Sequence, residues 1–405
     1  MSAVLLIPVL LAASPPAAEA RPAVTVGEPV ELLKLPKTEL PPVGLTRAVV
    51  RLSPDGERML YIRAHGPGKA KLHVRQVGQP RSDQSAVWDE PIPAFYCGMS
   101  FAGRAWRADG QRVLFCQEPA RDEDGWAEGV FGRRMRPWHM CWDLPNPQYK
   151  LCRHVGVRDA PGCTSLSYSP RGDVLWTAFS DTEGHKTCGV TGWPAGERRG
   201  FTAYRGTGAD IYHLAPSPDG THLAWVETYP REKGRPLQGP DVVVFRIQPR
   251  KVVLRVGLSR EIPGWLDAQA PVWAANSRGV CFGDVVEVDR IWRREVKVTD
   301  LTGRGEKLLA RDALAVGACA EGFVLNRGPA CAPMRQLISS HAPVGGGADR
   351  PAGDDVILCD PARAGKWVTL VPSAFAQQVC GRRVVYARAS GDDVLILAAA
   401  LKRGS

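Results

Sequence analysis

Residues with the types and spacing needed for chemistry are few in this chain. The stretch Asp210-Ile211-Tyr212-His213 places a carboxyl, a phenol and an imidazole close together. Such groups could act as general acid and base, although His213 is more ordinarily interpreted as a packed or hydrogen-bonded strand residue. The sequence holds no His-Glu-x-x-His and no Gly-x-Ser-x-Gly, so it shows no motif of a zinc protease or a serine hydrolase.

Metal and cofactor sites are not indicated by the sequence. Gly353-Asp354-Asp355 and Gly391-Asp392-Asp393 each place two carboxylates in a row. One acid pair per turn offers too few oxygens for Ca²⁺, so both stretches are interpreted as turns that feed strands. No Cys-x-x-Cys pair occurs, which argues against zinc. We therefore predict no metal and no cofactor.

Positive charge gathers in three stretches that we take as the candidate binding surface. Arginine can bind a carboxylate or phosphate through two hydrogen bonds, and an adjacent tryptophan can stack on a sugar or a planar group. A basic surface that is merely solvated would have the same sequence pattern, so that alternative stays open. The candidates are Arg133, Arg134, Arg136, Arg231, Lys233, Arg235, Arg290, Trp292, Arg293 and Arg294.

The elements that must position these residues are encoded by a repeat. Leu52-Ser53-Pro54-Asp55-Gly56 precedes the apolar run Arg58-Met59-Leu60-Tyr61-Ile62. Proline fixes φ at the turn entry, aspartate bonds nearby backbone and glycine takes the left-handed conformation, so each copy predicts strand, turn and strand. The clear copies contain Gly56, Gly110, Gly172 and Gly220, and the weaker ones contain Gly279, Gly322 and Gly381.

The spacing of the seven copies predicts the architecture. Intervals of roughly 40 to 60 residues fit units of four short strands, as in the blades of a β-propeller. In most of the clear copies an aromatic residue follows the glycine by five positions, which places it on one face of the returning strand. We predict an all-β chain with seven four-stranded blades; unrelated hairpins in another all-β fold are the alternative.

The Ser-Pro-Asp-Gly turn followed by an apolar-aromatic strand resembles the repeat of TolB-like β-propellers, which are relatives of WD40-like propellers. The resemblance covers most of residues 43–398. It implies a propeller fold, and because TolB-type propellers commonly have six blades, six is the alternative to seven. It implies little about function, because propellers include both binding proteins and enzymes.

The two ends of the chain are predicted to close the ring. The last blade has three strands at most, and Val30 to Leu35 reads as a strand without a hairpin partner. Pairing the two would remove exposed edges and join the termini. The predicted organisation is a signal peptide at 1–20, an N-terminal extension with the ring-closing strand at 21–42, and the propeller at 43–401.

Three long inserts are predicted to decorate one face of the ring. They span Pro119 to Arg136, Tyr229 to Pro240 and Asn326 to Gly353, and each joins the second strand of a blade to the third. Long loops on a rigid scaffold are where binding residues concentrate. Asp210, Tyr212 and His213 lie on an innermost strand, so they would line the mouth of the central channel.

The N-terminal residues predict export. Leu5 to Ala13 is apolar and Ala18-Glu19-Ala20 fits a cleavage site, although no Lys or Arg precedes the apolar run. Cleavage after Ala20 would place the chain in a periplasm or outside the cell. Its net charge, +10 for the full chain, points to an acidic partner, and export argues against nucleic acid. No apolar run is long enough for a transmembrane helix.

Eleven cysteines suit an oxidising compartment, and their odd number leaves at least one outside any intramolecular disulfide. Cys97 with Cys116 and Cys141 with Cys152 are possible disulfides; buried thiols that pack as small hydrophobes are the alternative. We predict an exported, monomeric, non-catalytic propeller that binds a protein or an acidic polymer through the basic loops. The alternative is a glycan or peptide hydrolase or lyase with Asp210 and His213 at the channel mouth.

Overall fold

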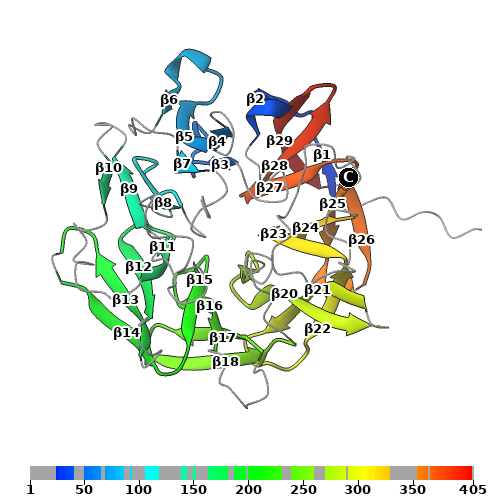
Figure 1. The fold of residues 1–405 in the computed structure, drawn as a ribbon. Helices are drawn as coiled ribbons and strands as arrows, with labels where there is room; N and C mark the ends of the chain where they lie inside the picture. Colours follow the sequence, from blue (N-terminus) through cyan, green and yellow to red (C-terminus); the bar gives the residue numbers. More distant parts are fainter. Residues whose placement is uncertain are drawn as a thin grey trace, which may run out of the picture.

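The computed structural model shows a ring of β-sheets around a central axis (Figure 1). It describes residues 24–40, 50–64, 69–85, 92–93, 105–117, 138–143, 149–151, 163–180, 187–197, 199–229, 239–259, 270–288, 291–328, 354–363 and 365–403. The predicted signal peptide lies outside these residues. Within them, no helix has the length and apolar character needed to cross a membrane.

The strands of the described residues form seven antiparallel sheets, which fits the predicted seven blades. Blade 1 contains β3 (Val50–Leu52), β4 (Arg58–Ala64), β5 (Lys69–Gln76) and β6 (Gln84–Ser85), with β7 (Ile92–Pro93) also paired to β5. Blade 2 contains β8 (Arg112–Gln117), β9 (Trp138–Asp143) and β10 (Tyr149–Leu151), with Trp106 bridged to Val113. Blade 3 contains β11 (Cys163–Tyr168), β12 (Val174–Ser180), β13 (Cys188–Pro194) and β14 (Phe201–Gly206).

The remaining blades follow the same order from the centre outward. Blade 4 contains β15 (Asp210–Pro216), β16 (His222–Thr228), β17 (Asp241–Arg246) and β18 (Lys251–Gly257). Blade 5 contains β19 (Val272–Trp273), β20 (Gly279–Val288), β21 (Ile291–Asp300) and β22 (Lys307–Arg311). Blade 6 contains β23 (Ala313–Cys319), β24 (Gly322–Arg327), β25 (Asp355–Cys359) and β26 (Trp367–Val371). Blade 7 contains β27 (Phe375–Cys380), β28 (Arg383–Ser390) and β29 (Asp393–Arg403), joined by β1 (Val24–Val26) and β2 (Val30–Pro36).

The repeated turn is held by the side chains that define it. In blade 1 the Ser53 hydroxyl accepts from the Arg58 backbone N–H and donates to Asp55, whose carboxylate also accepts from the Glu57 N–H. Gly56, with φ of 77°, donates its N–H to the Ser53 carbonyl. In blade 4, Ser217 and Asp219 form the same hydrogen bonds as Ser53 and Asp55. The turn is therefore a compact network that any copy of the motif can form locally.

Blade 5 departs from the predicted turn residue. Gly279 lies inside β20, and Ser277 takes the left-handed position with φ of 59°. The Ser277 N–H donates to the Ala274 carbonyl, as the Gly56 N–H does to the Ser53 carbonyl. Its hydroxyl accepts from the Asp219 N–H of blade 4. The predicted glycine was thus two residues too late, and this bond gives Ser277 a role that glycine could not fill.

The hydrophobic core lies between neighbouring blades, because both faces of each sheet are covered. Tyr61, Trp225 and Tyr386 are all buried and follow the turn glycine by five residues. Each packs toward the preceding blade, as does Phe282, which follows Ser277 by five. Trp176 follows its glycine by four residues and packs toward the next blade instead, because neighbouring strand positions point to opposite faces.

The ring closes through the N-terminal strand, as predicted. β2 pairs with β29 from Val30 opposite Ala398 to Pro36 opposite Asp393, and β1 continues along the same strand (Figure 1). The two Gly-Asp-Asp stretches also act as turn and strand residues: Asp355 accepts from the Ser373 N–H, and Asp393 forms an ion pair with Lys34 of β2. The outermost strand of blade 7 therefore comes from the other end of the chain.

Candidate binding faces

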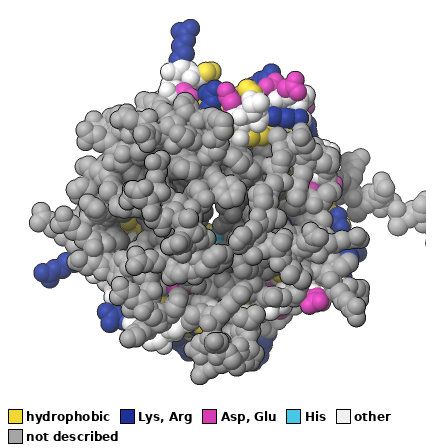
Figure 2. All heavy atoms as spheres, in the orientation of Figure 1, with side chains coloured by type: hydrophobic (Ala, Val, Ile, Leu, Met, Phe, Trp, Pro, Cys, Tyr) yellow, Lys and Arg dark blue, Asp and Glu magenta, His cyan; other side chains and the backbone are white. Residues whose placement is uncertain are grey.

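The ring has two ends, which we name by their connections. The turn face carries the turns that join the first strand of a blade to the second and the third to the fourth. The insert face carries the connections from second to third strand and from blade to blade. In the space-filling view a small gap opens at the centre of the ring, and the Lys and Arg side chains that can be seen lie at the outer edge of the molecule (Figure 2).

Two of the predicted binding arginines lie elsewhere than expected. Arg293 and Arg294 were predicted to belong to a basic loop, but β20 and β21 pair without interruption up to Val288 and Ile291, so both arginines are strand residues. Arg294 is buried, and Arg293 forms an ion pair of 3.5 Å with Asp312. Arg294 is therefore not available to a partner at the surface in this conformation.

The other predicted binding residues are not tested by the structure. Trp292 lies in β21 opposite Glu287, with no description of its side chain. The remainder fall outside the described residues, as do most of the three inserts: Arg133, Arg134, Arg136, Arg231, Lys233, Arg235 and Arg290.

The channel candidates lie on β15, the innermost strand of blade 4. Asp210 is buried at its insert-face end, opposite Thr228. The pairing of β15 with β16 shifts after Tyr212, and His213 has a left-handed backbone with φ of 55°. The Leu214 N–H, freed by this bulge, donates to the Ser165 hydroxyl of blade 3. Left-handed backbone is costly for a non-glycine residue and is often found at functional positions.

A buried carboxylate pair, not predicted from the sequence, lies at the insert face of blade 4. Glu227 on β16 and Asp241 on β17 stand directly opposite each other. One guanidinium nitrogen of Arg255 on β18 lies 2.7 Å from both carboxylates and from the Tyr229 hydroxyl. Burial would lower the pKa of Arg255, but hydrogen bonds with Asp241 and Glu227 raise it well above its ordinary value. Arg255 therefore stays positively charged beside the two carboxylates.

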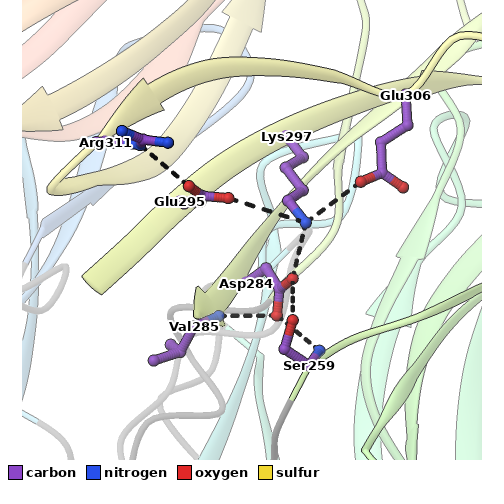
Figure 3. Close-up of polar contacts among 7 residues, drawn as sticks. All are labelled: Ser259, Asp284, Val285, Glu295, Lys297, Glu306 and Arg311. Carbon is purple, nitrogen blue, oxygen red and sulfur yellow. Dashed lines mark hydrogen bonds and ion pairs between the residues drawn. The ribbon is translucent and has the colours of Figure 1, made fainter. Parts of the chain in front are cut away.

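A second acid pair occupies the equivalent place in blade 5 (Figure 3). Asp284 and Glu295 stand opposite each other on β20 and β21. Asp284 accepts from the backbone N–H and hydroxyl of Ser259 and from Lys297 at 2.9 Å. Burial would lower the pKa of Lys297, but the hydrogen bond with Asp284 raises it. Because Ser259 follows the last strand of blade 4, this blade 5 cluster fixes the connection between the blades.

In both clusters, one buried acid occupies the same position relative to the left-handed turn residue of its blade, and the two acids have the same role. Glu227 follows Gly220 by seven residues, and Asp284 follows Ser277 by seven. Each carboxylate is buried and bound by a cation, so neither is a ready general base or metal ligand in this arrangement. No group of metal-binding side chains was found among the residues that the structure describes. We interpret the clusters as anchors for the insert-face connections.

The turn face carries an excess of exposed positive charge. Its cations come from all seven blades, and they outnumber the exposed acids of the same turns over the described ranges. The exposed cations are Arg81, Arg112, Arg171, Arg199, Arg246, Arg250, Lys251, Arg278, Arg304, Lys307, Arg363, Lys366, Arg382, Arg383, Lys402 and Arg403. The exposed acids are Asp55, Glu57, Asp109, Asp173, Glu197, Asp219, Asp300 and Glu306.

Most of these acids are engaged within their own turns. The Asp219 carboxylate accepts from Ser217 and Thr221, and Asp300 accepts from the Thr302 N–H and hydroxyl. By contrast, Arg171, Arg278 and Lys402 form no ion pair with any of the residues that the structure describes. The acids therefore maintain the turns, while many of the cations are left to face solvent.

Glu321, in the first turn of blade 6, holds the turn face of blade 7. It forms ion pairs of 3.0 Å with Arg403 and 3.5 Å with Arg382. The hydrogen bond from Arg403 lowers the pKa of Glu321 below its ordinary value of 4.5. A carboxyl group with a lowered folded-state pKa stabilises the fold above its unfolded pKa and loses that contribution as pH falls.

We therefore expect Glu321→Gln to reduce stability near neutral pH and to flatten the loss of stability in acid. Urea unfolding of both proteins between about pH 3 and pH 7 measures this, because the free-energy difference should shrink as Glu321 is protonated. Asp360→Asn is a suitable control, since the 4.0 Å pair of Asp360 with Arg363 is exposed. A difference that stays constant across the pH range would contradict this role of Glu321.

Five cysteines have described side chains, and all carry thiols. Cys188, Cys281, Cys319 and Cys359 are buried, and Cys380 is half-buried. Burial raises the pKa of Cys188 to about 11 and that of Cys359 to about 12, as expected of packed, unreactive thiols. The predicted disulfides are not tested: Cys97 and Cys152 lie outside the described residues, and only the backbone of Cys116 in β8 and Cys141 in β9 is described.

Comparisons with known proteins support the fold alone. A scan against protein-family models and a search of curated proteins found no match. Among solved structures, an oligogalacturonate lyase from Vibrio parahaemolyticus matches with a TM-score of 0.51 at 9% identity, covering 94% of this chain and 98% of that one.

Propellers of the kind predicted from the repeat are also among the similar structures. The β-propeller domain of Myceliophteria thermophila Cps50 (Swd1) gives a TM-score of 0.45 at 9% identity, covering 92% of this chain and 99% of that domain. TolB from Acinetobacter baumannii gives 0.41 at 15% identity over 64% of this chain, which spans about half (52%) of the TolB chain. The seven sheets and the match to the lyase show that the chain has a β-propeller fold, as the Ser-Pro-Asp-Gly repeat predicted.

Proposed function

We propose that this chain is an exported propeller that binds an acidic polymer on its turn face, without performing chemistry on it. The observation that carries the proposal is the excess of exposed cations over exposed acids on the turn face, among the residues that the structure describes. A ring of such charges attracts polyanions over long distances and gives binding that weakens with salt. The net charge of +10 for the whole chain supports the same partner.

A polymer fits this surface better than a folded protein does. Protein interfaces depend on buried aromatic and aliphatic anchors, and within the described residues only Val30 and Trp367 are exposed large hydrophobic residues. Trp367 begins β26 beside the exposed Lys366, at the turn face. A tryptophan beside a cation could stack on a sugar ring of a charged glycan. The predicted signal peptide supports a partner outside the cytoplasm.

An enzyme acting on a glycan or peptide is the second candidate, and the strained backbone at His213 favours it. The catalytic groups would then be Asp210 and His213 at the channel mouth. Asp210→Asn and His213→Ala should abolish any fragmentation of the bound polymer while leaving its binding intact. Size analysis of polymers incubated with the protein decides between the two, since the binding proposal expects no fragments.

Charge reversal on the two faces tests the proposal directly. The probes are fluorescently labelled alginate, polyphosphate and polyglutamate, measured by anisotropy at low and moderate salt. The turn-face variant changes to glutamate Arg171, Arg278, Arg304, Lys366 and Lys402. The matched insert-face variant changes to glutamate Arg133, Arg134, Arg231, Arg290 and Arg293.

We expect the turn-face variant to bind polyanions at least about tenfold more weakly and with a shallower salt dependence. The insert-face variant should bind like the parent protein. Loss of binding in the insert-face variant alone would instead favour the basic loops predicted from the sequence. Binding that is absent in the parent, or equal in all three proteins, would contradict the proposed function.

A further inference from the structure

The seam where the ring closes contains a hollow on the turn face. It has a volume of about 250 Å³ and lies between the first turn of blade 1 and the first turn of blade 7. Its lining residues are Leu52, Pro54, Asp55, Gly56, Cys380, Arg382, Arg383 and Ala400. The walls thus come from opposite ends of the propeller sequence.

Polar contacts hold the two blades together beside this hollow. The side-chain oxygen of Gln378 accepts from the Leu52 N–H at 2.6 Å, and its amide group donates to the Leu52 carbonyl at 3.4 Å. Arg51 donates to the Gln377 carbonyl. These bonds fix the innermost strands of blades 7 and 1 against each other, so the hollow has a defined shape at the seam.

The charge of the lining favours an anion. Arg382 shares Glu321 with Arg403, so one carboxylate serves two guanidinium groups. Arg383 is exposed and has no ion pair recorded among the described residues, and its guanidinium lies close to the backbone of Gly56. Asp55 is the acid of the lining, and its carboxylate is engaged by Ser53 and by the Glu57 N–H.

We propose that the seam hollow binds one anionic group of the polymer, a carboxylate or a phosphate, between Arg382 and Arg383. This inference rests on the proposed function and names its anchoring site. An anion held here contacts blade 7 through the arginines and blade 1 through the turn at Gly56, so it bridges the ring closure. Ligands that bind only the closed ring stabilise it by mass action.

Cys380 provides a reporter inside the hollow. It is the half-buried one of the five thiols with described side chains, and its sulfur lies 4.0 Å from the Ser53 carbonyl oxygen. An occupied hollow should protect this thiol from iodoacetamide, a neutral reagent, as followed by peptide mass mapping. At an anion concentration ten times its Kd, the labelling rate of Cys380 should fall about tenfold.

The experiment compares the parent with Arg382→Gln/Arg383→Gln, and uses Arg205→Gln, at an exposed position of β14 away from the turn face, as the control. The probes are inorganic phosphate, acetate, polyphosphate and alginate; the first two report the isolated group and the last two report its polymer. We expect protection of Cys380 and a raised thermal midpoint in the parent and in Arg205→Gln, and neither effect in the double variant. Comparing the phosphate and polyphosphate probes with the acetate and alginate probes distinguishes a phosphate site from a carboxylate site.

Failure of this inference can be told apart from failure of the proposed function. If alginate or polyphosphate binds through the turn face but leaves Cys380 labelling unchanged, the seam proposal is wrong and the proposed function stands. If phosphate or acetate protects Cys380 while neither polymer binds, the seam site stands and the polymer function is wrong. Equal protection in the parent and the double variant would overturn the role of Arg382 and Arg383.

Discussion

Replacing Leu35 by alanine is expected to lower the free energy of unfolding by about 2–5 kcal/mol, although the residue lies outside the repeated part of the sequence. Leu33 and Leu35 are buried on β2, opposite Ile396 and Val394 of β29. They pack in the cluster between blades 7 and 1 that also contains Tyr61. Shortening either side chain opens a cavity where strands from opposite ends of the chain close the ring.

The control for this prediction lies on the same strand. Val30 also belongs to β2, but 62% of its surface is exposed, so Val30→Ala should change stability by less than about 0.5 kcal/mol. Urea unfolding of the three proteins measures the difference. Similar small effects for Leu35→Ala and Val30→Ala would show that ring closure contributes little to stability.

The local chemistry of the turns explains why the blades could be predicted. Ser53, Asp55 and Gly56 satisfy one another within six residues, so the motif specifies its turn without help from distant parts of the chain. The ring-closing strand was also predictable, because a three-stranded last blade and an unpaired N-terminal strand complement each other. The weak copy in blade 5 was misplaced, since Ser277 takes the left-handed turn position two residues before the expected glycine.

The charged sites were harder to predict because they depend on register and on ring geometry. Glu227 meets Asp241 only through the pairing of β16 with β17, across an insert whose length hides the alignment. In the sequence, this pair was indicated by a carboxylate within an otherwise apolar strand. The turn-face cations are spread over the whole sequence as single residues or adjacent pairs, so the denser groups of arginines in the predicted loops were chosen instead. Closing the ring is what brings the scattered cations to one end.

Replacing Arg255 by methionine is the second substitution with a large expected effect. Glu227 and Asp241 would stay buried and opposite each other without their shared guanidinium. Breaking a buried pair by removing one partner is costly, because the remaining charge is uncompensated. Since Arg255 itself is 39% exposed, we discount the usual cost and expect a loss of about 2–3 kcal/mol in the free energy of unfolding.

A compensating variant separates lost charge pairing from lost packing. Arg255→Met/Glu227→Gln/Asp241→Asn removes all three charges while keeping the side-chain shapes, so most of the lost stability should return. The control is Arg363→Met, whose partner Asp360 lies 4.0 Å away on an exposed surface and whose loss should cost less than about 1 kcal/mol. Urea unfolding at neutral pH measures all three. If the triple variant is no more stable than Arg255→Met, the cluster acts through packing of the arginine stem, and the charge argument for blade 4 fails.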